Sequence, residues 1–157
     1  EMGLPAFVMR RYDDALQNAH STVEMNPSFA FGHYVLGDQY IQNKQYAAAI
    51  TELQTALRLD DSPVFLAKLG RAYASTGETG KVNSILKELS TRPYPPAYDI
   101  ALIYIALGNR EKVLEWFQRT YDDRSDAVLW LKNDPRLDAY RSEPRFIQLI
   151  KKLGLGK

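Results

Sequence analysis

Residues 75–81 (STGETGK) combine two glycines with a lysine, a composition found in loops that bind phosphate groups. In such loops the backbone N–H groups and the lysine surround the phosphate oxygens, and the motif GxxxxGK[ST] follows a β-strand. Here Ser75 occupies the place of the first glycine, and Val82 occupies that of the last hydroxyl residue. The segment before it is predicted to be a helix. We therefore interpret residues 77–80 as a turn between two helices.

Other residues that could carry chemistry also lack the required spacing. The histidines, His20 and His33, are thirteen residues apart with no cysteine and no HExxH motif, so no metal site is predicted and both are assigned packing or surface roles. Adjacent acidic residues at 13–14, 60–61 and 122–123 are predicted to lie at helix starts or ends. Carboxylates there accept hydrogen bonds from backbone N–H groups or tolerate the geometry of a turn. No serine stands in a recognisable nucleophile setting. The sequence predicts no enzyme and no cofactor.

Charge and composition favour a globular chain. Lys and Arg number 20 against 19 Asp and Glu, for a net charge of +1, so direct nucleic-acid binding is not expected. The basic residues near the C-terminus alternate with acidic ones and are interpreted as a solvated helix face. No apolar run approaches the roughly 18 residues that a membrane span needs, and with no cysteine we predict a cytoplasmic location. The chain begins partway through a repeat, as expected for a piece of a longer protein.

A repeat organises the elements that must position any functional side chain. Small residues recur at intervals of 34, 33 and 31, and each follows a bulky apolar residue. An aromatic residue comes three positions after the small residue in the last three copies, and a small or β-branched residue comes twelve positions after it in all four. The small residues are Gly3, Gly37, Gly70 and Ala101, and the residues twelve further on are Ala15, Ala49, Val82 and Val113.

This spacing has a physical explanation in paired helices. Two antiparallel helices approach closely only where side chains are small, so Gly37 and Ala49 are predicted to face each other. Glycine within a helix costs about 1 kcal/mol relative to alanine, so Gly37 and Gly70 need a packing reason. Turns are predicted at residues 43–44, 76–77 and 108–109, and prolines mark the breaks between repeats. No segment shows sustained strand alternation, so the predicted fold is all-α.

The pattern resembles the tetratricopeptide repeat (TPR), which residues 30–63 match at nearly every signature position. The resemblance implies helix-turn-helix repeats stacked in a right-handed superhelix, with a concave face lined by the first helix of each pair. We expect a single domain over residues 1–157. It would comprise a partial repeat at 1–27, repeats at 28–62, 63–94 and 95–124, and C-terminal capping helices at 125–157. Pro5 is badly placed for a full first helix in the partial repeat.

The last segment departs from the repeat and has the features of a cap. A helix from about Ser125 is predicted to stop near Asn133, because a proline disfavours helical backbone in the residue before it. A short turn and a second helix from about Glu143 follow, with Pro144 at the first helical position. Trp130 is predicted to anchor this cap. Terminal repeats need such a cap with one polar side.

The tail also carries a narrower resemblance. The stretches RRYDDAL, YDIALIYIALG and DRSDAVLWLKNDPRLDAYRSEPRF are similar to C-terminal TPR regions of multidomain bacterial signalling proteins. In those proteins the array follows a winged-helix DNA-binding, cyclase or protein-kinase domain. The resemblance therefore implies a bacterial regulatory context.

Residues of the first helices that vary between copies are candidates for binding. Aromatic rings beside a few polar groups suit an extended peptide or a partner helix. The candidate residues are Phe31, Tyr34, Asp38, Gln42, Lys68, Arg71 and Tyr98. For Tyr34 and Tyr98 packing between adjacent repeats is an equal alternative, whereas Lys68 and Arg71 are predicted to be exposed in the groove.

The resemblance also bears on the kind of partner. The chaperone-binding subset of the family holds a C-terminal carboxylate with a Lys/Asn/Lys/Arg set, and the matching places here hold Tyr34, Asp38, Val64 and Lys68. Since Asp38 would repel a carboxylate, recognition of an acidic tail is not predicted.

These features lead to one hypothesis and two rivals. The leading hypothesis is a non-catalytic protein–protein interaction module that binds a peptide or partner protein in the concave groove. The rivals are a regulatory or self-associating domain of a transcriptional regulator, cyclase or kinase, and a sensor of small ligands.

Overall fold

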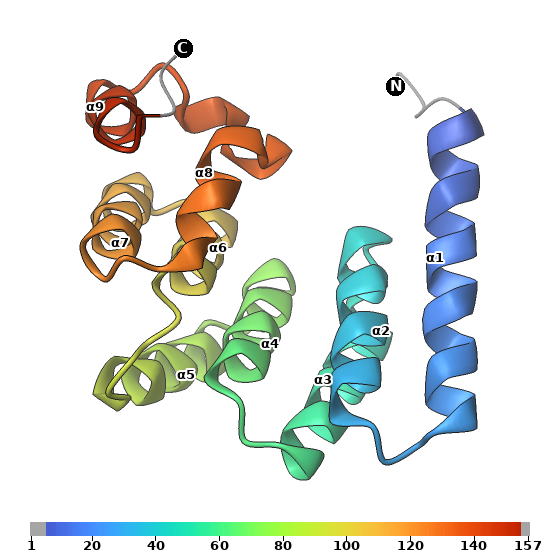
Figure 1. Ribbon diagram of the computed structural model, residues 1–157. Coiled ribbons are helices and arrows are strands. Elements are labelled where there is room, and N and C mark those ends of the chain that lie inside the picture. The colour runs from blue at the N-terminus through green and yellow to red at the C-terminus, as the bar shows by residue number, and fades with distance from the viewer. Residues whose placement is uncertain (1–5, 155–157) are drawn as a thin grey trace. The chain divides into compact units, whose positions relative to one another are not determined.

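The structure is a computed structural model that describes the backbone of residues 6–154 and the side chains of residues 14–154. Helices follow one another along the chain, and no strand occurs within the described backbone (Figure 1). The helices are α1 (Ala6–Met25), α2 (Ala30–Gln42), α3 (Tyr46–Leu59), α4 (Pro63–Ser75), α5 (Thr79–Thr91), α6 (Ala97–Ala106), α7 (Arg110–Asp122), α8 (Trp130–Asn133) and α9 (Pro144–Lys152), with 3-10 helices η1 (Asp126–Leu129) and η2 (Pro135–Tyr140). The predicted all-α fold of consecutively packed TPR-type helices is confirmed.

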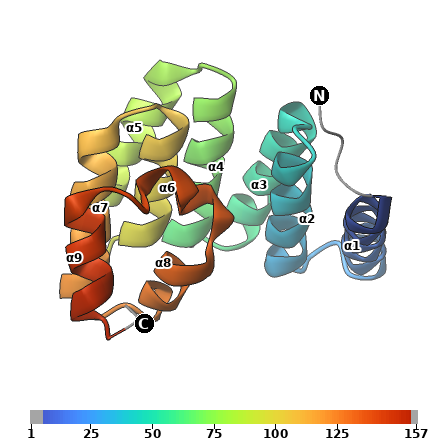
Figure 2. The ribbon, with the colours of Figure 1, turned by 90° about the horizontal axis from the view of Figure 1, so that it is seen from above.

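The chain divides into two compact units, Glu1–Leu89 and Ser90–Lys157. In the first unit, α2 packs against α1 and α3, and α3 packs against α4. In the second unit, α7 packs against α6 and α9, and Figures 1 and 2 both show these three helices side by side. The prediction of one domain over residues 1–157, with the repeat boundaries given above, stays a prediction.

The predicted turns lie where the sequence places them. Lys44, Gly77 and Gly108 adopt left-handed backbone with φ values of 58°, 78° and 69°, directly after α2, α4 and α6. This conformation ends a helix and lets the next one run back along it. Residues 77–80 therefore form a helix-to-helix turn followed by the first turn of α5, as predicted for the STGETGK stretch.

Close helix approach explains the glycine in α2. A Cβ atom on Gly37 would lie 2.7 Å from Cγ of Leu53 and 3.3 Å from the carbonyl oxygen of Ala49. Both neighbours are on α3, so α2 and α3 touch where the residues are small. The later small or β-branched positions, Val82 and Val113, are likewise fully buried. The packing role predicted for these columns is confirmed in the second to fourth copies, whereas Gly3 of the first copy lies outside the described residues.

The first repeat differs from a helix pair within the described backbone. Residues 6–25 form one uninterrupted helix, α1, with no turn inside it. The acidic pair at residues 13 and 14 therefore lies in the middle of a helix, and its predicted place at a helix end is wrong. The other acidic pairs follow or close α3 and α7, as predicted. Pro5, which was expected to disturb the first helix, lies outside the described residues.

The C-terminal segment folds as a cap whose helices have nearly the predicted bounds. η1 and α8 cover residues 126–133, η2 covers the predicted turn, and α9 begins at Pro144. Phe117, Leu131, Leu137 and Phe146 form the core of this unit together with α6. Trp130, by contrast, is 62% exposed, so its predicted anchoring role is wrong. Leu131, the next residue, fills that role, because its side chain is fully buried in the core of this unit.

Candidate peptide-binding face

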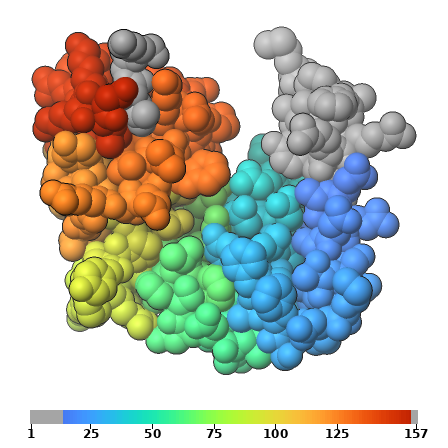
Figure 3. Space-filling model, in the orientation of Figure 1, coloured from blue at the N-terminus to red at the C-terminus, as the bar shows by residue number. Residues whose placement is uncertain are grey.

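Most of the candidate binding residues lie on α2 and α4, the first helices of two successive pairs. The two helices contact each other within the first unit, and their atoms meet directly in the space-filling view (Figure 3). Residues at positions i, i+3, i+4 and i+7 share one side of a helix. Tyr34 and Asp38 therefore lie on one side of α2, and Lys68 and Arg71 lie on one side of α4.

Aromatic rings form a continuous row across these helices. The ring of Tyr34 stacks on that of Phe65 with centroids 4.8 Å apart, and Phe31 lies 5.5 Å from Tyr34. Phe29 extends the row, at 6.1 Å from Phe31. Phe31 is 53% exposed, whereas Phe65 is buried. Stacked and tilted rings at these distances stabilise one another beyond their buried area.

Two members of this row were absent from the sequence-based candidates. Phe65 stands three residues before Lys68 on α4, so helical spacing from Lys68 was the signal that could have identified it. Phe29 lies just before α2 begins, where helical spacing does not apply.

Charged groups adjoin the aromatic row. The ammonium group of Lys68 lies 2.7 Å from Oδ1 of Asp38 and 5.3 Å from the centre of the Tyr34 ring. A guanidinium nitrogen of Arg71 lies 4.0 Å from the same Asp38 oxygen. Lys68 is therefore buried between Tyr34 and Asp38, and its predicted exposure is wrong. Arg71 is only partly exposed.

We call the set of six residues that meet here the α2/α4 face. It consists of Phe31, Tyr34, Asp38, Phe65, Lys68 and Arg71. Gln42, also a candidate, is exposed at the last position of α2, one turn beyond Asp38. The face offers an exposed ring and the carboxylate of Asp38, which Lys68 and Arg71 both approach. With one negative and two positive groups, the formal charge of the face is +1. Such a surface can bind apolar side chains and hydrogen-bonding groups.

Tyr98, the remaining candidate, lies in the second unit. It is buried in the core there, 6.1 Å from the ring of Phe117, and its hydroxyl donates a hydrogen bond to Asp134. Burial and the neighbouring Asp134 carboxylate raise the pKa of the Tyr98 hydroxyl above its ordinary value. A binding role for Tyr98 stays a prediction, whereas its packing role is evident.

Asp134 is the partner that holds Tyr98 in this core. Its carboxylate accepts hydrogen bonds from the backbone N–H of Arg136 at 2.9 Å and from the Arg136 guanidinium. Burial alone would raise the pKa of Asp134, but the hydrogen bonds from Arg136 and Tyr98 outweigh it and lower that pKa below its ordinary value. The network caps the first turn of η2.

The histidines take part in packing contacts. His33 is buried, with Nδ1 2.7 Å from Oε2 of Glu52 and Nε2 2.9 Å from the carbonyl oxygen of Pro27. Nε2 of His20 lies 2.7 Å from the hydroxyl of Tyr40. The His33–Glu52 contact joins α2 to α3 and the His20–Tyr40 contact joins α1 to α2, whereas Pro27 lies in the loop before α2. Across the described side chains, no three His, Asp or Glu residues converge in a way that could hold a metal ion.

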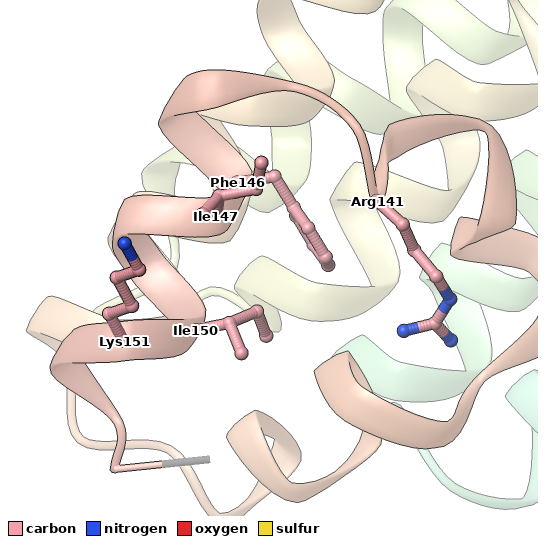
Figure 4. A pocket seen from close by; sticks show the side chains of 5 residues that line it. All are labelled: Arg141, Phe146, Ile147, Ile150 and Lys151. Carbon is pink, nitrogen blue, oxygen red and sulfur yellow. The ribbon is translucent and has the colours of Figure 1, made fainter. Parts of the chain in front are cut away.

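A small pocket lies in the C-terminal cap between η2 and α9. It has a volume of about 200 Å³ and is lined by Arg141, Phe146, Ile147, Ile150 and Lys151. Figure 4 shows Phe146 and Ile150 on the side toward Arg141, while Lys151 projects from the other side of α9. Arg141 itself bonds to Asp138 at 2.7 Å. The two cations therefore do not converge on one ligand, in keeping with a solvated basic face.

Within the described part of the chain, no helix combines the length and the apolar character that crossing a bilayer requires.

Two comparisons with known proteins agree with this architecture. The family model described as tetratricopeptide repeat matches residues 1–63 and 34–80, which together make about half of the chain. Mitochondrial import receptor subunit TOM70 of Saccharomyces cerevisiae, in strains YJM789 and ATCC 204508 / S288c, is 33% identical over 98 residues. That match covers 61% of this chain and 15% of the relative, so the chain spans only a small part of the curated proteins that it matches.

The family match covers α1 to α4, and with them every residue of the α2/α4 face. Repeats of this family form protein–protein interaction modules. Since the family model, the repeat columns and the paired helices all agree, the chain belongs to the tetratricopeptide repeat family.

Proposed function

We propose that the α2/α4 face binds an extended segment of a partner protein. The observation that carries the proposal is the row of rings from Phe31 through Tyr34 to Phe65, which continues into the Lys68–Asp38 pair. An exposed ring at one end offers apolar contact at a low entropy cost, because an aromatic side chain has few rotatable bonds. At the other end the Asp38 carboxylate, 26% exposed, can still accept a hydrogen bond from the segment.

The charges at this face bear on the kind of segment. Asp38 already engages Lys68 at 2.7 Å, so Lys68 is not free to hold an incoming carboxylate. A strongly acidic tail is therefore disfavoured, and a segment with apolar side chains and polar backbone groups is preferred. The concave-groove assignment implied by the family resemblance is part of this proposal. Gln42 stays a candidate for the same segment, and a binding role for Tyr98 stays a separate prediction.

The wider context is also proposed. The tail sequence is similar to C-terminal regions of bacterial signalling proteins, and we therefore place the module in a bacterial regulatory protein of the cytoplasm. Identification of a winged-helix, cyclase or kinase domain in the same polypeptide would support the regulatory context, and a different fused domain would contradict it.

Affinity capture with quantitative mass spectrometry tests the binding face. Phe31→Ala removes an exposed ring, so the fold should persist while recovery of bound partners falls by about fivefold or more. Tyr94→Ala is the matched control, because Tyr94 is 91% exposed and lies outside the first unit. Recovery that is equal for wild type and Phe31→Ala would contradict the proposed face.

Self-association is the rival hypothesis, and light scattering alone distinguishes it from binding of a different protein. Light scattering over a wide concentration range should report one monomeric mass if the face serves a different protein. A mass that rises with concentration and returns to the monomer value in Phe31→Ala would instead show that the partner is a second copy of the chain.

A further inference from the structure

A second surface lies in the C-terminal cap, on the outer side of η1 and α8. Its four principal residues follow the spacing i, i+3, i+4 and i+7, so they share one side of the continuous helical segment at residues 126–133. They are Asp126, Leu129, Trp130 and Asn133. The opposite side of the same segment carries Leu131, which is fully buried in the core.

The exposure of this surface is unusual for its composition. Leu129 and Trp130 are 65% and 62% exposed, although both are large apolar residues. They line an open cavity of about 450 Å³ together with Ala127, Asp126 and Asn133. Exposed apolar residues that are adjacent and rimmed by polar groups mark interaction sites, and tryptophan is enriched where binding energy concentrates.

Asp126 gives the cavity its charge. Among the described residues it is the only charged one that lines the cavity, and it forms no ion pair with any side chain in that part of the chain. By contrast, the neighbouring acidic residues are engaged: Asp122 accepts a hydrogen bond from Gln118 at 2.9 Å, and Asp123 lies 3.4 Å from the Arg119 guanidinium. Asp126 is thus an available carboxylate beside an available indole ring.

An indole face next to a carboxylate complements a cation. A guanidinium group stacks on an aromatic face while its N–H groups bond to a carboxylate, and the two contacts use different parts of the planar group. The amide of Asn133 adds a further acceptor, and Leu129 supplies apolar contact for the stem of a long basic side chain. We propose that this surface, which we call the Trp130 surface, binds an arginine side chain of a partner protein, flanked by apolar residues.

Other occupants fit this surface less well. An anionic ligand would face the Asp126 carboxylate, and no cation among the described lining residues would compensate it. A purely apolar segment would leave that carboxylate partly desolvated without a partner, which costs free energy. The proposal is independent of the α2/α4 face, since all lining residues belong to the second unit.

A fluorescence titration of the full chain tests the proposal. The chain holds two tryptophans, so Trp116→Phe leaves Trp130 as the only indole reporter. The probe is the blocked peptide acetyl-Leu-Arg-Leu-amide, and its matched control replaces arginine with glutamine. We expect a saturable change in Trp130 emission with the arginine peptide and a response at least about threefold weaker with the glutamine peptide.

Two variants locate the site. Asp126→Asn in the same background should weaken binding by about threefold to fivefold and reduce its dependence on salt, because one charge pair is lost. Glu24→Gln makes the same change of charge at an exposed residue of α1 and should leave binding unchanged. Trp130→Leu, followed by calorimetry, should abolish binding while the melting temperature stays near that of the wild type.

Several outcomes would overturn the proposal. They are the absence of saturable binding up to about millimolar peptide, equal binding of the arginine and glutamine peptides, and equal weakening by Asp126→Asn and Glu24→Gln. An emission change on dilution without peptide would also overturn it, because it would identify a second copy of the chain as the occupant.

Discussion

The hydroxyl of Tyr98 on α6 donates a hydrogen bond to the carboxylate of Asp134, 36 residues further along the chain. Asp134 precedes Pro135 and accepts a hydrogen bond of 2.9 Å from the backbone N–H of Arg136. It is therefore also the N-cap residue of η2. One buried carboxylate thereby connects a repeat helix to the C-terminal cap. Because a buried polar group that loses its partner costs free energy, this pair should govern how well the cap holds to α6.

The Tyr98–Asp134 pair predicts weaker folding in acid. The pKa of Asp134 in the folded state lies below its ordinary value. Ionised Asp134 therefore contributes fully to the free energy of unfolding when the pH is above the ordinary pKa. This contribution is lost as the pH falls through the folded-state pKa. We expect wild-type stability to fall below about pH 4. Asp134→Asn should lower stability at pH 7 by about 1–3 kcal/mol and remove part of this acid dependence.

Denaturant unfolding at pH 7, 5 and 3 measures this effect. Tyr98→Phe serves as the second variant, since it removes the hydroxyl and leaves the Arg136 contacts of Asp134 in place. An identical pH profile for wild type and Asp134→Asn would contradict the prediction.

The ion pair between Asp38 and Lys68 should stabilise the first unit. Lys68 is buried, so Asp38→Asn leaves an ammonium group without its carboxylate and should cost about 1–3 kcal/mol. Lys68→Met together with Asp38→Asn should recover part of the loss, because no charge is then buried. A double-mutant cycle by chemical denaturation gives the coupling energy.

The control for that cycle is the pair Lys112–Glu115, whose side chains are exposed. Exposed pairs contribute about 0–1 kcal/mol, so Glu115→Gln should change stability little. Equal losses of stability for Asp38→Asn and Glu115→Gln would show that the buried pair stabilises the protein no more than an exposed pair does.

Gly37 should tolerate no larger side chain. The Cβ atom of Gly37→Ala would lie 2.7 Å from Leu53 Cγ, so the Leu53 side chain or the two helices must shift, at a cost of about 1–3 kcal/mol. Gly80→Ala is the matched control, since Gly80 lies in α5 with open space around it and the change should raise stability by about 0.4–1 kcal/mol. Thermal unfolding of both variants measures the contrast, and a Gly37→Ala protein as stable as wild type would contradict close packing here.

Two leucines, Leu129 and Leu131, lie on the outer and the buried side of the cap, respectively. Leu131→Ala removes a fully buried side chain from the core of the second unit and should cost about 2–5 kcal/mol. Leu129→Ala should change stability by no more than about 0.5 kcal/mol, because Leu129 is exposed. Equilibrium unfolding followed by circular dichroism compares them, and similar losses for both would place Leu129 in the core.

Much of the fold could be predicted from the sequence. The columns at Gly37, Ala49, Val82 and Val113 predicted where helices touch, and the prolines and glycines predicted where helices begin and end. These predictions succeed because helix packing depends on side-chain size at regular spacing, which is local information. The prediction failed at residues 13–14, where a continuous helix replaces an expected helix end.

The candidate site was predicted only in part. Helical spacing identified Tyr34, Asp38 and Arg71 as neighbours on two first helices. It could not show that Lys68 turns inward to Asp38, since the direction of a flexible side chain depends on partners from another helix. For the same reason the repeat alignment did not separate Tyr98, which bonds to Asp134, from residues that face a partner.

The sequence by itself determined the class of fold, the positions of the turns and the family, because each depends on residue types at fixed intervals along the chain. Tertiary structure alone decided which of the non-repeating side chains are available. Lys68 and Tyr98 are buried by partners 30 and 36 residues away, whereas Trp130 is exposed because Leu131 fills the core beside it. Such choices arise from competition for space and for charged partners among residues distant in the sequence, and only the folded chain brings those residues together.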